Sequence, residues 1–184
     1  MKVSYLFLAA GFEEIGAITV ADVLRRAGIN VKTVSMTDGL EVSGEHNIVV
    51  FADLKYKDTK FDDSDFFILP GGSDGTKNLF YNDDFKMNLL DHYNKGLKVA
   101  AIGESPSILG ELNMLDSKNA TCAPGFEHFL NGATYTAMPI EIQDNVLTGR
   151  GPAAAMKFAI AIVSMISGKE VADKVSKELL LIID

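Results

Sequence analysis

The chain has 184 residues, a length that fits one domain spanning 1–184, because two domains would each hold fewer than about 100 residues. Hydrophobic residues make up 47% and charged residues 23%, which excludes intrinsic disorder. The 25 acidic residues exceed the 17 lysines and arginines, giving a formal net charge of -8. Such a chain lacks the positive surface that nucleic acid or an anionic membrane requires, so we expect neither as a partner.

The cysteine content and the apolar segments together predict a cytoplasmic protein. The single cysteine, Cys122, excludes an internal disulfide or a cysteine-built metal site and suits a reducing compartment. The apolar run 3–10 is short and lacks a clear cleavage context, so it indicates a buried strand rather than a signal peptide. The apolar segment 156–166 is too short to span about 30 Å of hydrocarbon and indicates a core helix.

In the first half of the chain, short apolar runs alternate with helical patterns. A strand over 3–8 precedes a helix over 15–27, whose apolar stripe consists of Ile15, Ile18, Ala21 and Leu24. A strand over 30–36 follows, and 41–44 with 47–51 predict a hairpin inserted into the alternation. The next strand, 66–69, ends in Pro70-Gly71-Gly72.

The second half continues the alternation less regularly. The pattern predicts a helix over 83–93, a strand over 98–102 and a helix that ends at Leu112. Short strands are expected at 133–137, 140–143 and 146–148. Pro152 fits the first position of the last long helix, Gly168 closes that helix, and 169–177 adds a terminal one.

This alternation predicts an α/β fold, with a mostly parallel sheet and helices on both faces. Ligand sites in such sheets lie beyond the carboxyl ends of the strands. The loops 9–14, 70–75 and 103–107 are therefore the candidate site loops.

The sequence gives no sign of a cofactor or a metal. Neither a dinucleotide-binding fingerprint nor a phosphate-binding loop follows a strand. His46, His92 and His128 are scattered and fit surface or turn positions, whereas a catalytic metal needs about three converging ligands. Cys122 fits a buried, inert thiol better than a nucleophile. We expect no cofactor and no metal.

The turn after strand 98–102 is the most specific feature. Its sequence, Gly103-Glu104-Ser105-Pro106-Ser107, opens a helix directly after a buried strand, which is the layout of a nucleophile elbow. The raised position is Gly103, which has no side chain to react. Two neighbouring residues could replace the missing side chain: Glu104 as an acid or base, or Ser105 as a nucleophile. No histidine is evidently placed to activate the serine. A helix-capping role is the simpler interpretation of both residues.

Motifs along nearly the whole chain resemble the ThiJ/PfpI family, the DJ-one superfamily. They are Gly11-Phe12-Glu13-Glu14, Arg25-Arg26-Ala27-Gly28, Leu69-Pro70-Gly71-Gly72, Ala100-Ala101-Ile102, Thr121-Cys122-Ala123-Pro124-Gly125-Phe126-Glu127 and Thr148-Gly149-Arg150-Gly151-Pro152. The resemblance implies a flavodoxin-like three-layer sandwich and a homodimer. Activities across the family include glyoxalase, deglycase, and amidase or protease reactions, and oxidative-stress sensing.

The resemblance also implies three functional positions, all of which lack their side chains here. The family's reactive cysteine falls on Gly103, its glutamate on Gly16, and its third residue, a histidine or tyrosine, on Ala123. A thiolate is the nucleophile and the redox sensor, so glycine cannot replace it. Three separated changes favour natural divergence over a single engineered substitution.

These observations predict a homodimer without catalysis that binds a small carboxylate or carbonyl metabolite, or a protein partner, in the former active site. Backbone N–H groups of Gly71, Gly72, Gly103 and Glu104 are the expected ligand contacts. Two alternatives stay open. One is an enzyme of glyoxalase, deglycase or amidase type that uses Glu104 or Ser105, and the other is a fold kept mainly as an assembly or chaperone-like surface. Whether Arg25 or Arg150 reaches the site is also open.

Overall fold

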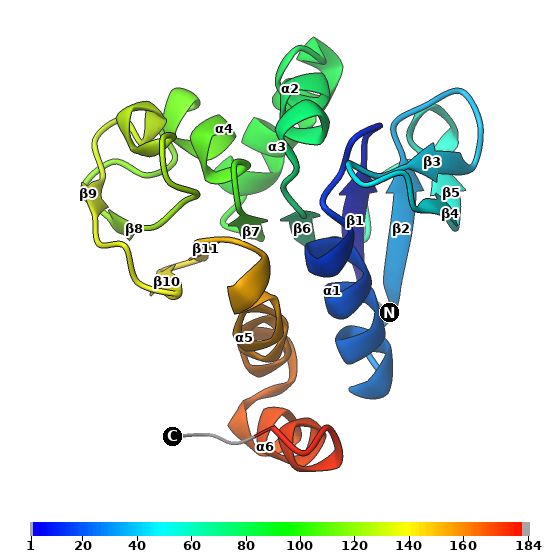
Figure 1. Cartoon of the computed structure of the whole chain (residues 1–184), viewed down its shortest axis with the longest axis vertical. Helices are drawn as coiled ribbons and strands as arrows, with labels where there is room; N and C mark the ends of the chain where they lie inside the picture. Colours follow the sequence, from blue (N-terminus) through cyan, green and yellow to red (C-terminus); the bar gives the residue numbers. More distant parts are fainter. Residues whose placement is uncertain (1, 182–184) are drawn as a thin grey trace.

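A central seven-stranded sheet organises the computed structural model, which describes residues 2–181 (Figure 1). The strand order is β10-β11-β7-β6-β1-β2-β5. All neighbouring strands are parallel except β10, which is antiparallel to β11, so the prediction of a mostly parallel sheet is confirmed. The strands are β1 (Val3–Leu8), β2 (Val31–Ser35), β5 (Leu54–Lys55), β6 (Ser64–Leu69), β7 (Lys98–Ile102), β10 (Ile140–Gln143) and β11 (Val146–Gly149).

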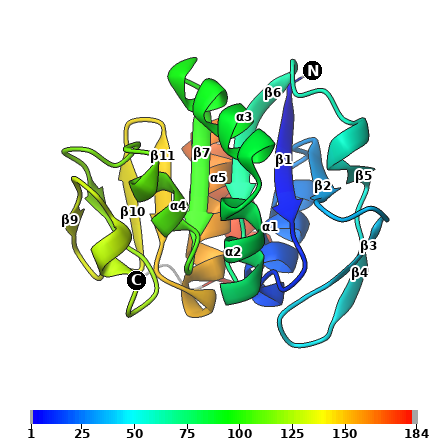
Figure 2. The ribbon, with the colours of Figure 1, turned by 90° about the horizontal axis from the view of Figure 1, so that it is seen from above.

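Helices cover both faces of this sheet, as Figures 1 and 2 show from two directions. One face carries α1 (Glu14–Arg26) and α5 (Ala155–Ser167), and α6 (Lys169–Glu178) packs on α5 beyond them. The other carries α2 (Ser73–Phe80), α3 (Asp83–Asn94) and α4 (Pro106–Glu111). The expected three-layer flavodoxin-like sandwich is therefore confirmed.

Alternation along the strands divides the core into two layers. In β1, Leu6 and Leu8 pack toward α1 and α5, whereas Tyr5 and Phe7 pack toward α3 and α4. Successive side chains of a strand point to opposite faces, so a strand covered on both faces is apolar at nearly every position. This is why the first apolar run belongs to a buried strand.

The predicted apolar stripe of α1 is wrong in its first half. Ile15 and Ile18 are 57% and 47% exposed, while the buried face runs through Ala17, Val20 and Leu24. The start of the helix abuts the loop after β6, where only a small residue fits. The larger isoleucine side chains consequently face outward.

The smaller elements depart most from the predictions. Helix α2 was not predicted, because its sequence is short and mostly polar. The segment 133–137 forms only β9 (Thr134–Tyr135), which pairs with β8 (Asn119–Ala120) outside the main sheet. Pro152 begins a 3-10 turn, η3 (Pro152–Ala154), rather than α5 itself.

The predicted hairpin is confirmed as β3 (Glu41–Ser43) and β4 (Val49–Phe51). Two further 3-10 turns are η1 (Tyr56–Asp58) and η2 (Glu127–Phe129). Within residues 2–181, no helix combines the length and the apolar character needed to cross a bilayer.

Candidate ligand site at the strand-to-helix elbow

Gly103 lies at the carboxyl end of β7 in the left-handed backbone region, with φ +70. This confirms the predicted elbow, because side chains other than glycine rarely adopt that conformation. Its N–H donates to the Gly149 carbonyl at 3.0 Å, and its own carbonyl accepts the Ala123 N–H at 2.8 Å. A Cβ added at Gly103 would meet only the Gly71 Cα, at 3.6 Å. The elbow thus keeps both its backbone geometry and the space for a side chain.

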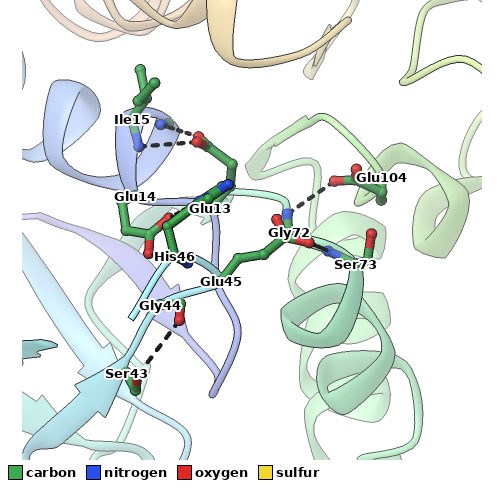
Figure 3. A network of polar contacts seen from close by, with 11 residues as sticks. Glu13, Glu14, Ile15, Ser43, Gly44, Glu45, His46, Gly72, Ser73 and Glu104 are labelled. Carbon is green, nitrogen blue, oxygen red and sulfur yellow. Dashed lines mark hydrogen bonds and ion pairs between the residues drawn. The ribbon is translucent and has the colours of Figure 1, made fainter. Parts of the chain in front are cut away.

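The Glu104 side chain turns back across the elbow to the N-terminus of α2. Its Oε2 accepts the Gly72 N–H at 2.9 Å, and Oε1 of Glu45, from the β3–β4 turn, accepts the Ser73 N–H at 3.3 Å (Figure 3). The helix has no side-chain cap from Gly72, its own N-cap residue. Two carboxylates from distant segments therefore cap α2, where the helix dipole favours negative charge.

Some N–H groups that the sequence analysis predicts as ligand contacts already donate hydrogen bonds within the protein. The Gly72 and Gly103 N–H groups both have internal acceptors, Glu104 and the Gly149 carbonyl. The Gly71 carbonyl accepts the Glu13 N–H at 3.1 Å, which joins the loops after β1 and β6. The four predicted contact residues lie together, but an anion at Gly72 would have to displace Glu104.

Ser105, the other candidate to replace the missing side chain, has no exposed surface. Its Oγ lies 2.9 Å from Thr76 Oγ1, in a buried hydroxyl pair that joins α4 to α2. The pair satisfies two buried polar groups, which is a structural role.

Gly16, where the family's glutamate falls, faces the same region from α1. Its N–H donates to the Glu13 carboxylate, which caps the helix. A Cβ at Gly16 would lie 2.7 Å from the Pro70 carbonyl oxygen. The N-terminal turn of α1 thus packs directly against the loop after β6, and a larger residue requires the backbone to move.

Glu14 forms an ion pair with the β3–β4 turn. Its buried carboxylate accepts the His46 N–H at 2.6 Å and contacts His46 Nδ1 at 2.8 Å. Burial opposes ionisation, but the hydrogen bonds from His46 outweigh it and hold the pKa of Glu14 below its usual value. The same bond and the charge of Glu14 raise the pKa of His46. The pair fastens the hairpin to the start of α1.

The expectation of no metal stays a prediction, although three possible ligands converge, and the expected surface or turn position of His92 is wrong. Ligand atoms of Glu13, Glu14 and His46 lie within 4.8 Å of one another, so three groups able to hold a metal do converge. The pairing of Glu14 with His46 and the capping of α1 by Glu13 already account for this arrangement. His92 is buried rather than on the surface, and its ring stacks on Phe67 at 3.9 Å between centroids.

The hydrogen bonds of His92 define its protonation. Nε2 donates to the Lys98 carbonyl at 2.9 Å, so Nδ1 accepts the Ser64 hydroxyl at 3.0 Å. Burial lowers the pKa of His92 to about 4, which leaves the ring neutral.

Cys122 has no exposed surface, and burial raises the pKa of its thiol to about 12. A buried thiol held in the protonated form is a poor nucleophile. Of the two arginines left open, Arg25 pairs with Asp53 at 2.8 Å on the outside of α1. Arg150 instead directly follows Gly149, whose carbonyl holds the elbow N–H.

The fold and the elbow together define the class: a flavodoxin-like α/β protein whose strand-to-helix elbow carries a glycine. The DJ-1/PfpI family profile matches residues 1–165, and the chain belongs to this family. The chain is 31% identical to protein dj-1beta of Drosophila melanogaster over 182 residues, covering 98% of this chain and 97% of that protein. The crystal structure of Drosophila melanogaster DJ-1beta superposes with a TM-score of 0.93, at 30% identity and 99% coverage of both chains.

A more distant relative carries a name that describes an activity. The glutathione-independent glyoxalase DJ-1 of Schizosaccharomyces pombe is 25% identical over 183 residues, covering 95% of this chain and 96% of that protein. A DJ-1 superfamily protein from Salmonella typhimurium matches in structure with a TM-score of 0.93 at 25% identity, covering all of both chains.

Sequence reasoning missed the network that surrounds the elbow. Glu13 and Glu14 enter the sequence analysis only as part of the motif Gly11-Phe12-Glu13-Glu14, and Glu45 is not singled out there. The Glu45-His46 pair in a predicted hairpin turn was the available signal, but nothing in the spacing links that turn to α1 or α2.

Proposed function

We propose that the chain is a binding protein of the DJ-1/PfpI family that works without thiol chemistry. The observation that carries this proposal is the elbow: Gly103 keeps the raised backbone conformation and has no side chain. The one cysteine cannot substitute for the missing thiol, because Cys122 is fully buried and its pKa is raised. A buried free thiol also suits a reducing cytoplasm, the compartment we propose.

The charges around the elbow favour a neutral carbonyl metabolite over a carboxylate at this position. The carboxylates of Glu13, Glu14, Glu45 and Glu104 lie in one region between the N-termini of α1 and α2, where His46 pairs with Glu14 (Figure 3). A further anion there would meet several like charges and would have to displace Glu104 from the Gly72 N–H. A carbonyl oxygen carries no net charge and avoids this repulsion.

A second copy of the chain is the partner we propose. Ile15 and Ile18 on α1, and Val49 and Phe51 at the hairpin, are large apolar side chains that are 47–75% exposed. Apolar side chains gathered on neighbouring elements typify a protein interface. Homodimerisation through this face would remove them from water.

A relocated enzyme is the second candidate function, and the position of Glu104 is the observation that favours it. Glu104 directly follows Gly103, the position on which the family's cysteine falls, and its carboxylate, which accepts the Gly72 N–H, can act as a general base. Conversion of methylglyoxal and water into lactate needs a base to move a proton between adjacent carbons. Ser105 is a weaker candidate, since it is buried against Thr76.

A methylglyoxal turnover assay with lactate detection separates the two functions. The binding proposal expects no turnover above the uncatalysed rate by the wild-type chain, but saturable binding of a neutral carbonyl probe such as hydroxyacetone. Turnover by the wild-type chain that Glu104→Gln abolishes would overturn it in favour of the enzyme. Glu45→Gln is the matched control, because Glu45 also caps α2 but comes from the hairpin.

A further inference from the structure

A pocket lies beside the elbow, between the loop after β8, the start of β10 and the N-terminus of α5. It has a volume of about 520 Å³. Its walls are mostly apolar and include Pro124, Pro139 and Pro152, and its two charged residues are Arg150 and Lys157. No acidic residue lines it.

Arg150 and Lys157 differ from most cations of this chain because neither pairs with any acidic residue that the structure describes. The net charge is -8, and 11 of the 17 lysines and arginines form ion pairs within the part that the structure describes. Arg150 and Lys157 have no carboxylate within 4.0 Å among residues 2–181, and both are exposed. Two like charges that face one pocket repel each other, and a bound anion would relieve this repulsion.

The start of α5 adds to the positive potential of the pocket. Pro152, Ala153 and Ala154 line it and lead directly into the helix. The helix has no side-chain cap at Ala154 and no acidic residue in its first turn. The positive end of the α5 dipole is therefore not neutralised by the chain's own side chains, in contrast to α2.

The pocket is joined to the elbow through the backbone. Arg150 follows Gly149, whose carbonyl accepts the Gly103 N–H at 3.0 Å. Pro124 follows Ala123, whose N–H donates to the Gly103 carbonyl at 2.8 Å. The positive charge of Arg150 also acts on the pKa of Cys122, in the opposite direction to Glu104. The two sites are neighbours with opposite charge.

We propose that this pocket binds a small organic monocarboxylate, with Arg150 and Lys157 pairing its carboxylate and the proline rings contacting its apolar body. A guanidinium group matches the geometry of a carboxylate with two parallel hydrogen bonds. The apolar walls favour an organic anion over free phosphate, which has no apolar part. This site is separate from the elbow and does not depend on the function proposed for Gly103 and Glu104.

Titration of the ¹⁵N-labelled wild-type chain, followed by amide chemical shifts, tests the site with isobutyrate. We expect saturable shifts of the Gly151, Ala153 and Ala154 amides, and none with isobutyramide, which has the same shape without the charge. Arg150→Gln and Lys157→Gln should each weaken binding about tenfold, the effect of losing one charged hydrogen bond. Lys177→Gln is the matched control, because Lys177 is also exposed and unpaired among residues 2–181 but lies on α6.

Three outcomes would overturn the proposal. Equal shifts with isobutyramide would show that charge does not drive binding, and unchanged affinity in both cation variants would show that the pocket is not the site. Phosphate that binds as tightly as isobutyrate would show a general anion site without selectivity for an organic body. Shifts confined to Gly72 and Glu104 would refute this pocket while leaving ligand binding at the elbow intact.

Discussion

Replacing Gly103 with cysteine tests whether the elbow still presents a side chain. A Cβ at this position meets only the Gly71 Cα, at an ordinary contact distance of 3.6 Å, so no other atom has to move. The cost is the backbone conformation, because φ is +70 and an L side chain in the left-handed region costs roughly 1–2 kcal/mol. We expect Gly103→Cys to fold and to lose about 1–2 kcal/mol of unfolding free energy.

Urea unfolding measures this loss, and Gly103→Ala is the matched control, since it carries the same strain without a thiol. Alkylation by iodoacetamide, followed by intact mass in a Cys122→Ala background, measures the reactivity of the introduced thiol. We expect one modification in the native state. The nearby Glu104 carboxylate disfavours the thiolate, so adding Glu104→Gln should speed the reaction.

Two results would refute the reasoning. An introduced thiol that is alkylated no faster than buried Cys122 in the native wild-type chain would mean that the elbow does not present its side chain. A loss above about 4 kcal/mol in both the alanine and the cysteine variants would mean that the position is sterically closed, because strain alone is worth less.

The remaining predictions concern stability, oxidation and assembly. Gly16→Glu, alone or with the elbow cysteine, should unfold at markedly lower urea than wild type, because its Cβ would lie 2.7 Å from a backbone carbonyl oxygen; equal midpoints would contradict this. His46→Gln should unfold at lower urea than wild type below pH about 6.5, because the raised pKa of His46 stabilises the folded wild-type chain there. This stabilisation disappears as the pH rises through the raised pKa, so the urea midpoints of wild type and variant should converge at high pH. His92, whose pKa is lowered to about 4, makes the folded state more stable as the pH rises, in wild type and variant alike. The measurement is therefore the difference in unfolding free energy between wild type and His46→Gln at each pH. Cys122 should gain no oxygen in intact mass after mild peroxide, and rapid stoichiometric addition would make it the reactive thiol. Phe51→Glu should shift a dimer to monomer in sedimentation, whereas a monomeric wild type would remove the basis for that interface.

Much of the fold could be predicted from the sequence, because burial on both faces leaves a strong signal in strands such as β1 and β7. The elbow at Gly103 could be located because a buried strand, a glycine and a helix start follow one another within a few residues. Helix α2 could not be predicted because it is eight residues long and mostly polar, and because the carboxylates that cap it are 28 and 32 residues away in the chain. No local pattern reports such distant caps.

The sequence also could not predict that Glu104 occupies the predicted ligand contact at Gly72, because this hydrogen bond too joins distant segments. The sequence places Gly72 and Glu104 at the same edge of the sheet, yet it does not show that one accepts the hydrogen bond of the other. The orientation of α1 was equally hidden, since Ile15 and Gly16 are neighbours and only packing against the loop after β6 selects which one faces inward. Pairings between side chains of distant segments are decided by tertiary structure.

The different surroundings of Gly103 and Gly16 have a consequence for the history of the site. In the genetic code, one base change turns a glycine codon into a cysteine codon, and one turns a glycine codon into a glutamate codon. The first change meets open space at the elbow, whereas the second meets the Pro70 carbonyl oxygen at 2.7 Å. The elbow could therefore accommodate a thiol without a change in packing, whereas a glutamate at position 16 would first require α1 to move away from the loop that follows β6. The close packing of Gly16 against the Pro70 carbonyl, rather than the number of base changes, therefore limits which side chains this site can hold.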